Sequence, residues 1–185
     1  MSRRQPQYGI TPPICVNKPK NEEMNMTIEL QKHLKPFQVF DTDEGLQNRI
    51  RVLTKLNDLV KTFVEKVLEL KNLPTSIDGV KITGKIYTFG SYRLGVHTQG
   101  ADIDTLCVVP TGVERNDFFT TFSRMLKETE GVEDVRQIEN AFVPVIKLYF
   151  ERIEIDILFA QLQLNTIKDD QVSFIRKLAR AGSRL

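Results

Sequence analysis

Acidic residues in two apolar segments could together form one catalytic site. Asp102 and Asp104 stand two residues apart at the start of an apolar run, and a strand places residues two apart on the same face. Glu154 and Asp156 alternate with isoleucines in a later run and also share a face. If the two runs are neighbouring strands, the carboxylates of Asp102, Asp104 and Asp156 converge. Their mutual repulsion must be relieved by protons or a cation, and hard carboxylate oxygens suit Mg²⁺ or Mn²⁺.

A carboxylate cluster of this kind indicates phosphoryl or nucleotidyl transfer. It could hold two cations roughly 3.5 to 4 Å apart, one activating an attacking hydroxyl and the other bridging a nucleoside triphosphate and its leaving pyrophosphate. Gly90 and Ser91 follow a predicted strand, where a glycine lets backbone N–H groups approach a phosphate closely. Taken singly, Gly-Ser is also typical of an ordinary turn, and Asp-x-Asp of a solvated or capping pair. The order of strand, Gly-Ser, Asp-x-Asp on a strand and a later isolated Asp favours the transferase interpretation.

Helix and strand patterns predict the elements that must position these residues. Apolar residues recur at three- and four-residue steps over 41–70, which predicts a long amphipathic helix with Asp41 or Thr42 as its cap. Residues 81–89 are rich in β-branched and aromatic types and predict a strand that runs into a turn. The nearly all-apolar run 103–109 predicts a strand covered on both faces.

The second half of the chain continues the alternation of helix and strand. Phenylalanines and other apolar residues at helical spacing predict a helix over 116–130. The runs 143–150 and 153–159 are separated only by Glu151-Arg152, which predicts a β-hairpin, although neither residue is the Asn or Gly that such turns favour. A short basic helix is expected over 171–180. The predicted fold class is therefore α/β, a mixed β-sheet with packed helices.

Composition limits the class of protein. The chain has 185 residues, 41% hydrophobic and 27% charged with a net charge of +2, which indicates one soluble, intracellular domain with tails. No apolar run reaches the roughly 18 to 20 residues that span a bilayer, so we expect no membrane association. Cys15 and Cys107 are expected to be reduced thiols. Both ends are basic, which suits either phosphate contacts or simple solubility.

The ordered motifs resemble the nucleotidyltransferase superfamily typified by DNA polymerase beta. In finer detail they resemble the eukaryotic nuclear poly(A) polymerase family, from Tyr8 to about Ile167. The segments that carry this resemblance are the Gly-Ser motif at 89–98, Asp-Ile-Asp after Ala101, Asp-Phe-Phe at 117–119, 141–147 and 153–160. The resemblance implies a polymerase beta-like nucleotidyltransferase domain that adds AMP from ATP to the 3′ end of RNA, with two Mg²⁺ or Mn²⁺ ions.

The resemblance also implies roles for individual residues. The metal-binding catalytic aspartates are Asp102, Asp104 and Asp156, with Asp156 as the partner of the primer hydroxyl. Contacts with ATP are implied for these aspartates and for Phe89, Gly90, Ser91, Thr98 and Ile103. Contacts with the RNA 3′ end are implied for Phe142, Val143 and Lys147.

Several of these residues have a structural alternative. Phe142 offers a stacking face and Lys147 a charge for a backbone phosphate, but Phe142 and Val143 are equally compatible with a core position, and Lys147 with an exposed strand lysine. Arg93 could reach phosphates or support its loop. For His97 we expect a structural hydrogen bond rather than a catalytic role.

The domain organisation follows the resemblance. We expect an extended, proline-containing arm over 1–25, a catalytic domain over 26–167 and a divergent basic helix over 168–185, without the family's middle and RNA-binding domains. Half a cleft is expected to bind nucleotide weakly. The resemblance implies a nuclear, monomeric protein whose partners are the RNA 3′ end, ATP and the cleavage and polyadenylation machinery. Two alternatives stay open: a non-catalytic form that binds RNA or a protein partner, and a relative that transfers another nucleotide such as uridylate.

Overall fold

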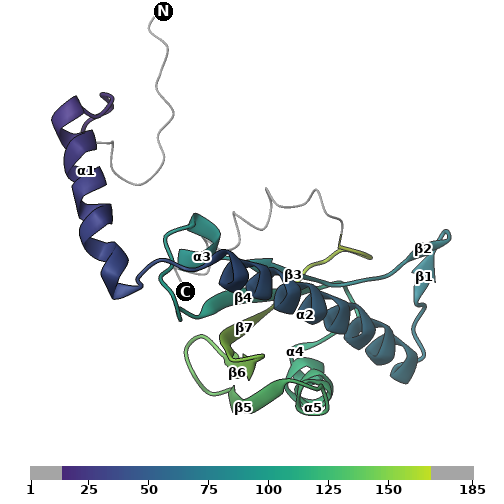
Figure 1. Cartoon of the computed structure of the whole chain (residues 1–185). Coiled ribbons are helices and arrows are strands. Elements are labelled where there is room, and N and C mark those ends of the chain that lie inside the picture. Colours follow the sequence, from purple (N-terminus) through teal and green to yellow (C-terminus); the bar gives the residue numbers. More distant parts are fainter. Residues whose placement is uncertain (1–13, 168–185) are drawn as a thin grey trace, which may run out of the picture. The chain divides into compact units, whose positions relative to one another are not determined.

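The computed structural model describes residues 14–167 (Figure 1). The chain divides into two compact units, residues 1–39 and 40–185. The predicted boundaries near residues 25 and 167 stay predictions, and the basic helix expected over 171–180 lies outside the described residues. No helix within 14–167 is long and apolar enough to cross a membrane.

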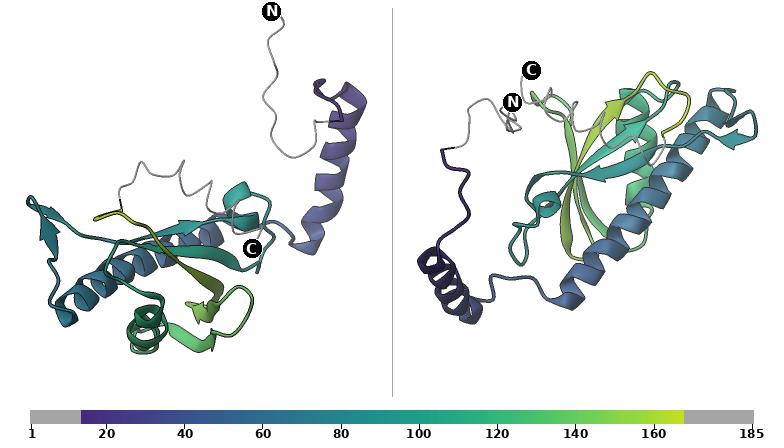
Figure 2. Two further views of the ribbon diagram at one scale, coloured as in Figure 1. Left: turned by 180° about the vertical axis from the view of Figure 1, so that it is seen from behind. Right: turned by 90° about the horizontal axis from the view of Figure 1, so that it is seen from above.

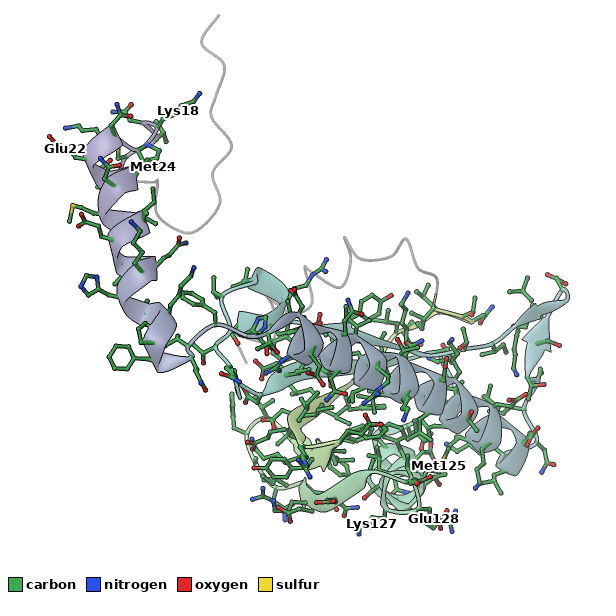
Figure 3. All side chains as sticks on the ribbon, viewed as in Figure 1. Lys18, Glu22, Met24, Met125, Lys127 and Glu128 are labelled. Atoms are coloured by element: carbon green, nitrogen blue, oxygen red, sulfur yellow. The ribbon has the colours of Figure 1, made fainter. Side chains whose placement is uncertain are left out.

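The first unit contains helix α1 (Asn21–Leu34) and a single 3₁₀ turn, η1 (Lys35–Phe37). The extended conformation expected up to residue 25 is therefore wrong from Asn21 onward. Glu22 and Glu23 lie in the first turn and Lys32 and His33 in the last, an arrangement that favours the helix dipole. None of the residues of α1 is buried, and its side chains project from the helix (Figure 3). Local preferences, and no apolar core, thus stabilise this helix.

The second unit begins with the predicted long helix, α2 (Asp43–Leu70). Thr42 is its N-cap, since its hydroxyl accepts a hydrogen bond from the Gly45 N–H at 3.0 Å. One face of the helix is buried by Val52, Leu56, Val60, Phe63, Val64, Val67 and Leu68. The amphipathic pattern in the sequence therefore predicted the helix and most of its packed face, although Ile50 at the same spacing is exposed.

A five-stranded mixed sheet lies behind this helix, in the order β3-β4-β7-β6-β5 (Figures 1 and 2). The strands are β3 (Lys85–Thr88), β4 (Ile103–Val109), β5 (Val132–Ile138), β6 (Val145–Phe150) and β7 (Ile153–Gln161). Only β4 and β7 are parallel; the other neighbours in this sheet are antiparallel. The predicted hairpin is confirmed as β6 and β7, and Glu151 and Arg152 both adopt positive φ angles in its turn, 48° and 68°.

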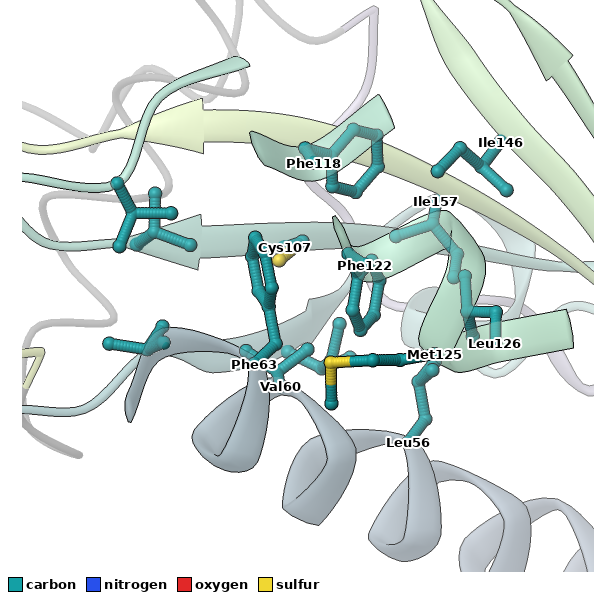
Figure 4. Packing of buried hydrophobic residues seen from close by; sticks show 14 of the residues in the cluster. Leu56, Val60, Phe63, Cys107, Phe118, Phe122, Met125, Leu126, Ile146 and Ile157 are labelled. Atoms are coloured by element: carbon teal, nitrogen blue, oxygen red, sulfur yellow. The ribbon is translucent and has the colours of Figure 1, made fainter. Parts of the chain in front are cut away.

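The helix expected over 116–130 is present as α4 (Arg115–Asp117), a π-helical turn η2 (Phe118–Phe122) and α5 (Ser123–Lys127). Together with α2 it covers one face of the sheet. Phe63 of α2 packs against Phe122, with ring centroids 4.8 Å apart, and Phe118 stacks on Phe122 at 5.6 Å (Figure 4). The main core therefore lies between these helices and the sheet.

The described residues cover the opposite face of the sheet only in part. Val108 packs there with Leu162 and Ile167, whereas Asp104 and Leu106 of the same strand are half-buried. Within residues 14–167, the expectation that 103–109 is covered on both faces holds at the C-terminal end of β4 and fails at its start, because residues 162–167 pack over the C-terminal end.

One strand prediction needs correction, and one strand was not predicted. The run 81–89 is divided: Val80–Lys81 (β2) pairs with Ser76–Ile77 (β1) in a separate two-stranded ribbon, and β3 starts only at Lys85. Gly84 lies between them, so close to the sheet that an added Cβ would stand 2.9 Å from the Val108 carbonyl oxygen. Strand β5 had no counterpart among the predicted elements.

Candidate active site

Three carboxylates meet on the face of the sheet that α2 does not cover. The parallel pairing of β4 and β7 sets Asp104 directly beside Asp156, and Asp102 comes two residues before Asp104. One carboxylate oxygen from each of the three lies within 4.8 Å of the others, and all three residues are half-buried. The convergence predicted from the spacing of the acidic residues is therefore present in the fold.

The electrostatics of this cluster fit a cation. Burial, and then the charges of Asp102 and Asp156, raise the pKa of Asp104, while Lys147 acts in the opposite direction. Asp156 Oδ1 is buried without a hydrogen-bond partner among the described residues. An acceptor oxygen that is desolvated and unpaired is costly. Three converging carboxylates with one free buried oxygen match the oxygen ligands that Mg²⁺ and Mn²⁺ prefer.

Lys147 belongs to the same site. It lies opposite Asp156 in the β6–β7 hairpin, and its Nζ donates to Asp156 Oδ2 at 2.5 Å. This hydrogen bond is the main cause that raises the pKa of Lys147. The interpretation of Lys147 as an exposed strand lysine is therefore wrong, since it is a partner of the carboxylate cluster. The sequence held the signal: a two-residue turn at Glu151-Arg152 sets Lys147 across from Asp156.

The Gly-Ser turn passes directly over Asp104. Phe89 donates its N–H to the Asp104 carbonyl oxygen at 3.1 Å. Gly90 has φ +63°, and an added Cβ would stand 2.1 Å from Asp104 Oδ2. Any side chain at this position would therefore collide with the carboxylate and strain the backbone. Glycine is needed here for both reasons, and the half-buried backbone of the turn lies beside the cluster.

The other residues expected to contact ATP differ in their placement. Ser91 is half-buried in the short helix α3 (Gly90–Leu94), and Thr98 is exposed in the loop that leads to Asp102. Ile103 is fully buried, and the alternation along β4 turns its side chain away from the face that carries the aspartates. A nucleotide on the carboxylate face would meet Ile103 through its backbone.

The residues expected to contact RNA fall into two groups. Phe142 and Val143 lie in the connection between β5 and β6 and are 82% and 47% exposed, so the alternative that places them in the core is wrong. Two large apolar side chains in solvent are available to a ligand. Lys147, by contrast, is engaged with Asp156.

Two further side chains near the site differ from expectation. Neither ring nitrogen of His97 has a hydrogen-bond partner among the described residues; Nε2 lies 3.6 Å from Asp41 Oδ2, and the ring contacts Tyr92. The structural hydrogen bond expected for His97 is therefore absent from the described part of the chain. Glu154 accepts a hydrogen bond from the Tyr149 hydroxyl at 3.3 Å and lies outside the three-carboxylate cluster.

Comparison with known proteins identifies the family of the chain. Residues 9–176 match the family model of the poly(A) polymerase nucleotidyltransferase domain, which extends past Ile167. Poly(A) polymerase PAPa of Candida albicans is 43% identical over 165 residues, covering 88% of this chain and 29% of that protein. Poly(A) polymerase of Dictyostelium discoideum is 38% identical over 162 residues, covering 88% and 20%. The chain thus spans less than a third of the length of either relative.

Solved structures share the fold. The RNA terminal uridylyl transferase Cid1 aligns with a TM-score of 0.51 at 16% identity, over 86% of this chain and 40% of that one. The GLD-2/RNP-8 complex gives a TM-score of 0.50 at 19% identity, over 86% and 44%. At such identities the likeness concerns the arrangement of sheet and helices. The family model and the curated relatives also show the family, because they match the sequence along nearly its whole length. The chain belongs to the poly(A) polymerase nucleotidyltransferase family.

Proposed function

We propose that the carboxylate site transfers AMP from ATP to the 3′ end of RNA. The observation that carries this proposal is the convergence of Asp102, Asp104 and Asp156 beside the Gly90 turn, in a chain of the poly(A) polymerase family. Acidic ligands next to a glycine-containing turn suit a triphosphate that must be held in line with an attacking hydroxyl.

In this reaction the RNA 3′ hydroxyl oxygen bonds to the α-phosphorus of ATP, and the bond from that phosphorus to pyrophosphate breaks. Asp102, Asp104 and Asp156 would hold two divalent cations, Mg²⁺ or Mn²⁺, which neutralise the charge that develops on the transferring phosphoryl group. Asp156 would accept the hydroxyl proton at Oδ1, the oxygen without a partner among the described residues. Lys147, which donates to Oδ2, fixes the orientation of that carboxylate.

Substrate contacts follow from the same geometry. The backbone around Gly90 and the Ser91 hydroxyl would hold the triphosphate, and Thr98 would contact the nucleotide from its loop. Phe142 is exposed enough to stack on a base near the RNA 3′ end, and Val143 lies beside it. The names of the curated relatives favour ATP over another nucleotide. Action in the nucleus, and contact with the cleavage and polyadenylation machinery, belong to this proposal as properties implied by the family.

The test is extension of a labelled oligo(A) primer by the purified chain with Mn²⁺ and each of the four nucleoside triphosphates. We expect extension with ATP that Asp102→Ala abolishes. Asp58→Ala is a matched control, because Asp58 is an exposed aspartate of α2 whose partner among the described residues is Lys61 on the same helix. Extension by Asp102→Ala at the wild-type rate would overturn the proposal.

Two further outcomes would overturn the proposed AMP transfer, and each would indicate another function. A folded chain that binds RNA equally with and without Asp102 and ATP, and extends no primer, would indicate a non-catalytic binding protein. Extension with UTP in preference to ATP would indicate a uridylyl transferase.

A further inference from the structure

A buried ion pair lies beside the loop that leads into β4. Arg49, on the second turn of α2, donates from Nε to Asp41 Oδ2 at 2.7 Å, and the two side chains are 5% and 9% exposed. Asp41 Oδ1 also accepts the Thr42 N–H at 3.0 Å. Gly45 leaves room for the pair, since a Cβ there would stand 2.1 Å from Asp41 Oδ1. The start of α2 is thus built around a single desolvated arginine and its carboxylate.

The same arginine contacts the backbone next to a catalytic residue. Arg49 Nη1 donates to the carbonyl oxygen of Ala101 at 2.8 Å, and Ala101 immediately precedes Asp102. The planar guanidinium therefore bridges Asp41 and Ala101 with two of its donors at a fixed angle. A lysine at this position has one ammonium group on a flexible stem and cannot reproduce both contacts with the same geometry.

The loop held by Arg49 carries other parts of the proposed site. Ala101 donates its N–H to the Thr98 carbonyl oxygen at 3.1 Å, and Val96 donates to the Ser91 carbonyl oxygen at 3.1 Å. The loop is thus tied to the Gly-Ser turn at one end and to Arg49 at the other. His97 fills the space next to Asp41, with Nε2 3.6 Å from Oδ2.

We propose that Arg49, oriented by Asp41, is a positioning residue that fixes the Ala101 carbonyl and thereby places the Asp102 carboxylate against Asp104 and Asp156. This proposal rests on the proposed function of the carboxylate site. A buried ion pair by itself adds little stability, because desolvation offsets its attraction. Arg49, however, contacts the residue before a proposed metal ligand, so we expect it to affect metal binding rather than stability. Groups that orient ligands change metal affinity and activity by about 10- to 100-fold.

The first test compares Arg49→Lys with Arg51→Lys in the whole 185-residue chain. Arg51 is a matched control on the same helix, 62% exposed and paired with Glu151. Binding of Mn²⁺ alone is measured by the electron spin resonance signal of the free ion, and primer extension gives kcat and KM. We expect Arg49→Lys to weaken Mn²⁺ binding about 10-fold and to lower kcat about 100-fold with KM for the primer unchanged. Arg51→Lys should match wild type.

A second variant decides the case in which Arg49→Lys does not fold. Asp41→Asn/Arg49→Met leaves no buried charge unpaired, retains an acceptor for the Thr42 N–H, and removes the contact with Ala101. It should fold and show the same weakened Mn²⁺ binding. Wild-type Mn²⁺ affinity and kcat in either folded variant would overturn the positioning role.

The Mn²⁺ measurement also separates this proposal from the proposed function. If Asp102→Ala weakens Mn²⁺ binding and Arg49→Lys does not, the positioning role alone fails. If Asp102→Ala leaves Mn²⁺ binding intact, the metal site itself fails, and the positioning role fails with it. If both variants weaken Mn²⁺ binding but the wild-type chain extends no primer, the positioning role stands and the transfer activity of this chain fails.

Discussion

The two faces of the sheet differ in what the same strands present. Toward α2, strands β4 and β7 place Thr105, Cys107, Ile155 and Ile157, all fully buried. Toward the opposite side they place Asp104 and Asp156, half-buried and within reach of each other. Adjacent residues on one strand thus have separate effects, one on the stability of the core and the next on the chemistry of the site. This separation lets a charged cluster form without entering the apolar core.

The largest effect should follow from a change on the carboxylate face. Asp104→Asn removes one of the three charges, so primer extension with Mn²⁺ and ATP should fall by at least about 10³-fold, the loss of roughly 4 kcal/mol of transition-state stabilisation. The thermal unfolding midpoint of the metal-free variant should not fall, because burial, and then the charges of Asp102 and Asp156, oppose ionisation of Asp104. A variant that unfolds at a much lower temperature would contradict the separation of the two faces.

A substitution at the next residue, on the face that α2 covers, should lower stability and leave metal binding unchanged. Ile157→Ala leaves a cavity beneath α2 and should lower the free energy of unfolding by about 2–5 kcal/mol, measured by urea denaturation. Mn²⁺ affinity of the folded chain should stay at the wild-type value, since Ile157 is fully buried and points away from Asp156. A parallel loss of Mn²⁺ affinity would show that the two faces are coupled.

Gly90→Ala should affect chemistry more than folding. The added methyl group would meet Asp104 Oδ2, and alanine is strained at φ +63°. A displacement of about 1 Å at a reacting group can cost on the order of 100-fold in rate, whereas the backbone strain costs about 1–2 kcal/mol. Single-turnover extension and urea denaturation measure the two effects. A wild-type rate would exclude close contact between the turn and the carboxylate.

The smallest predicted effect is on stability and concerns the ion pairs between α2 and the β6–β7 turn. Glu151 is paired with Lys55 and Arg51 at 2.5 Å each, and the hydrogen bond from Lys55, followed by that from Arg51, holds the pKa of Glu151 below its usual 4.5. The ionised Glu151 carboxylate therefore stabilises the fold above pH 4.5. This contribution disappears as the pH falls through the lowered pKa and the carboxylate is protonated.

The thermal unfolding midpoint, measured from pH 7 to pH 3, tests the contribution of these ion pairs to stability. The unfolding midpoint of Glu151→Gln should lie below that of wild type at pH 7, and the difference should narrow in acid. Glu139→Gln, on an exposed loop, should follow wild type throughout. A constant difference between wild type and Glu151→Gln at every pH would exclude the ion pairs as its cause.

Much of the fold could be predicted because its patterns are local. The long stripe on α2, the apolar run of β4 and the two-residue link of the hairpin each depend on residues close in sequence. Strand β5 has no such pattern: its apolar residues Val132, Val135 and Ile138 are three apart, and a register shift between Glu133 and Arg136 breaks the alternation. In helix α1 the apolar residues Met24, Met26, Ile28 and Leu30 alternate with polar ones, so hydrophobic periodicity gave no helix signal for it.

Part of the candidate site could also be predicted from the sequence, as part of the fold could. The spacing of Asp102 and Asp104 and the alternation around Asp156 indicated a shared face, and their convergence required only that the two strands be neighbours. Lys147 could have been added from the hairpin register. The bridge from Arg49 to Ala101 could not, because it joins a helix and a loop whose proximity depends on the whole sheet.

The parallel pairing of β4 with β7 has a consequence for the order of folding. The hairpin β6–β7 joins segments close in sequence, whereas β4 and β7 meet only after the chain between them, including α4, α5 and two strands, has closed into a loop. Such closure carries an entropic cost and slows folding. Asp104 and Asp156 are brought together by that pairing alone. The three-carboxylate cluster therefore forms only once the most distant pairing in the described sheet has formed, and the proposed chemistry depends on that step of folding.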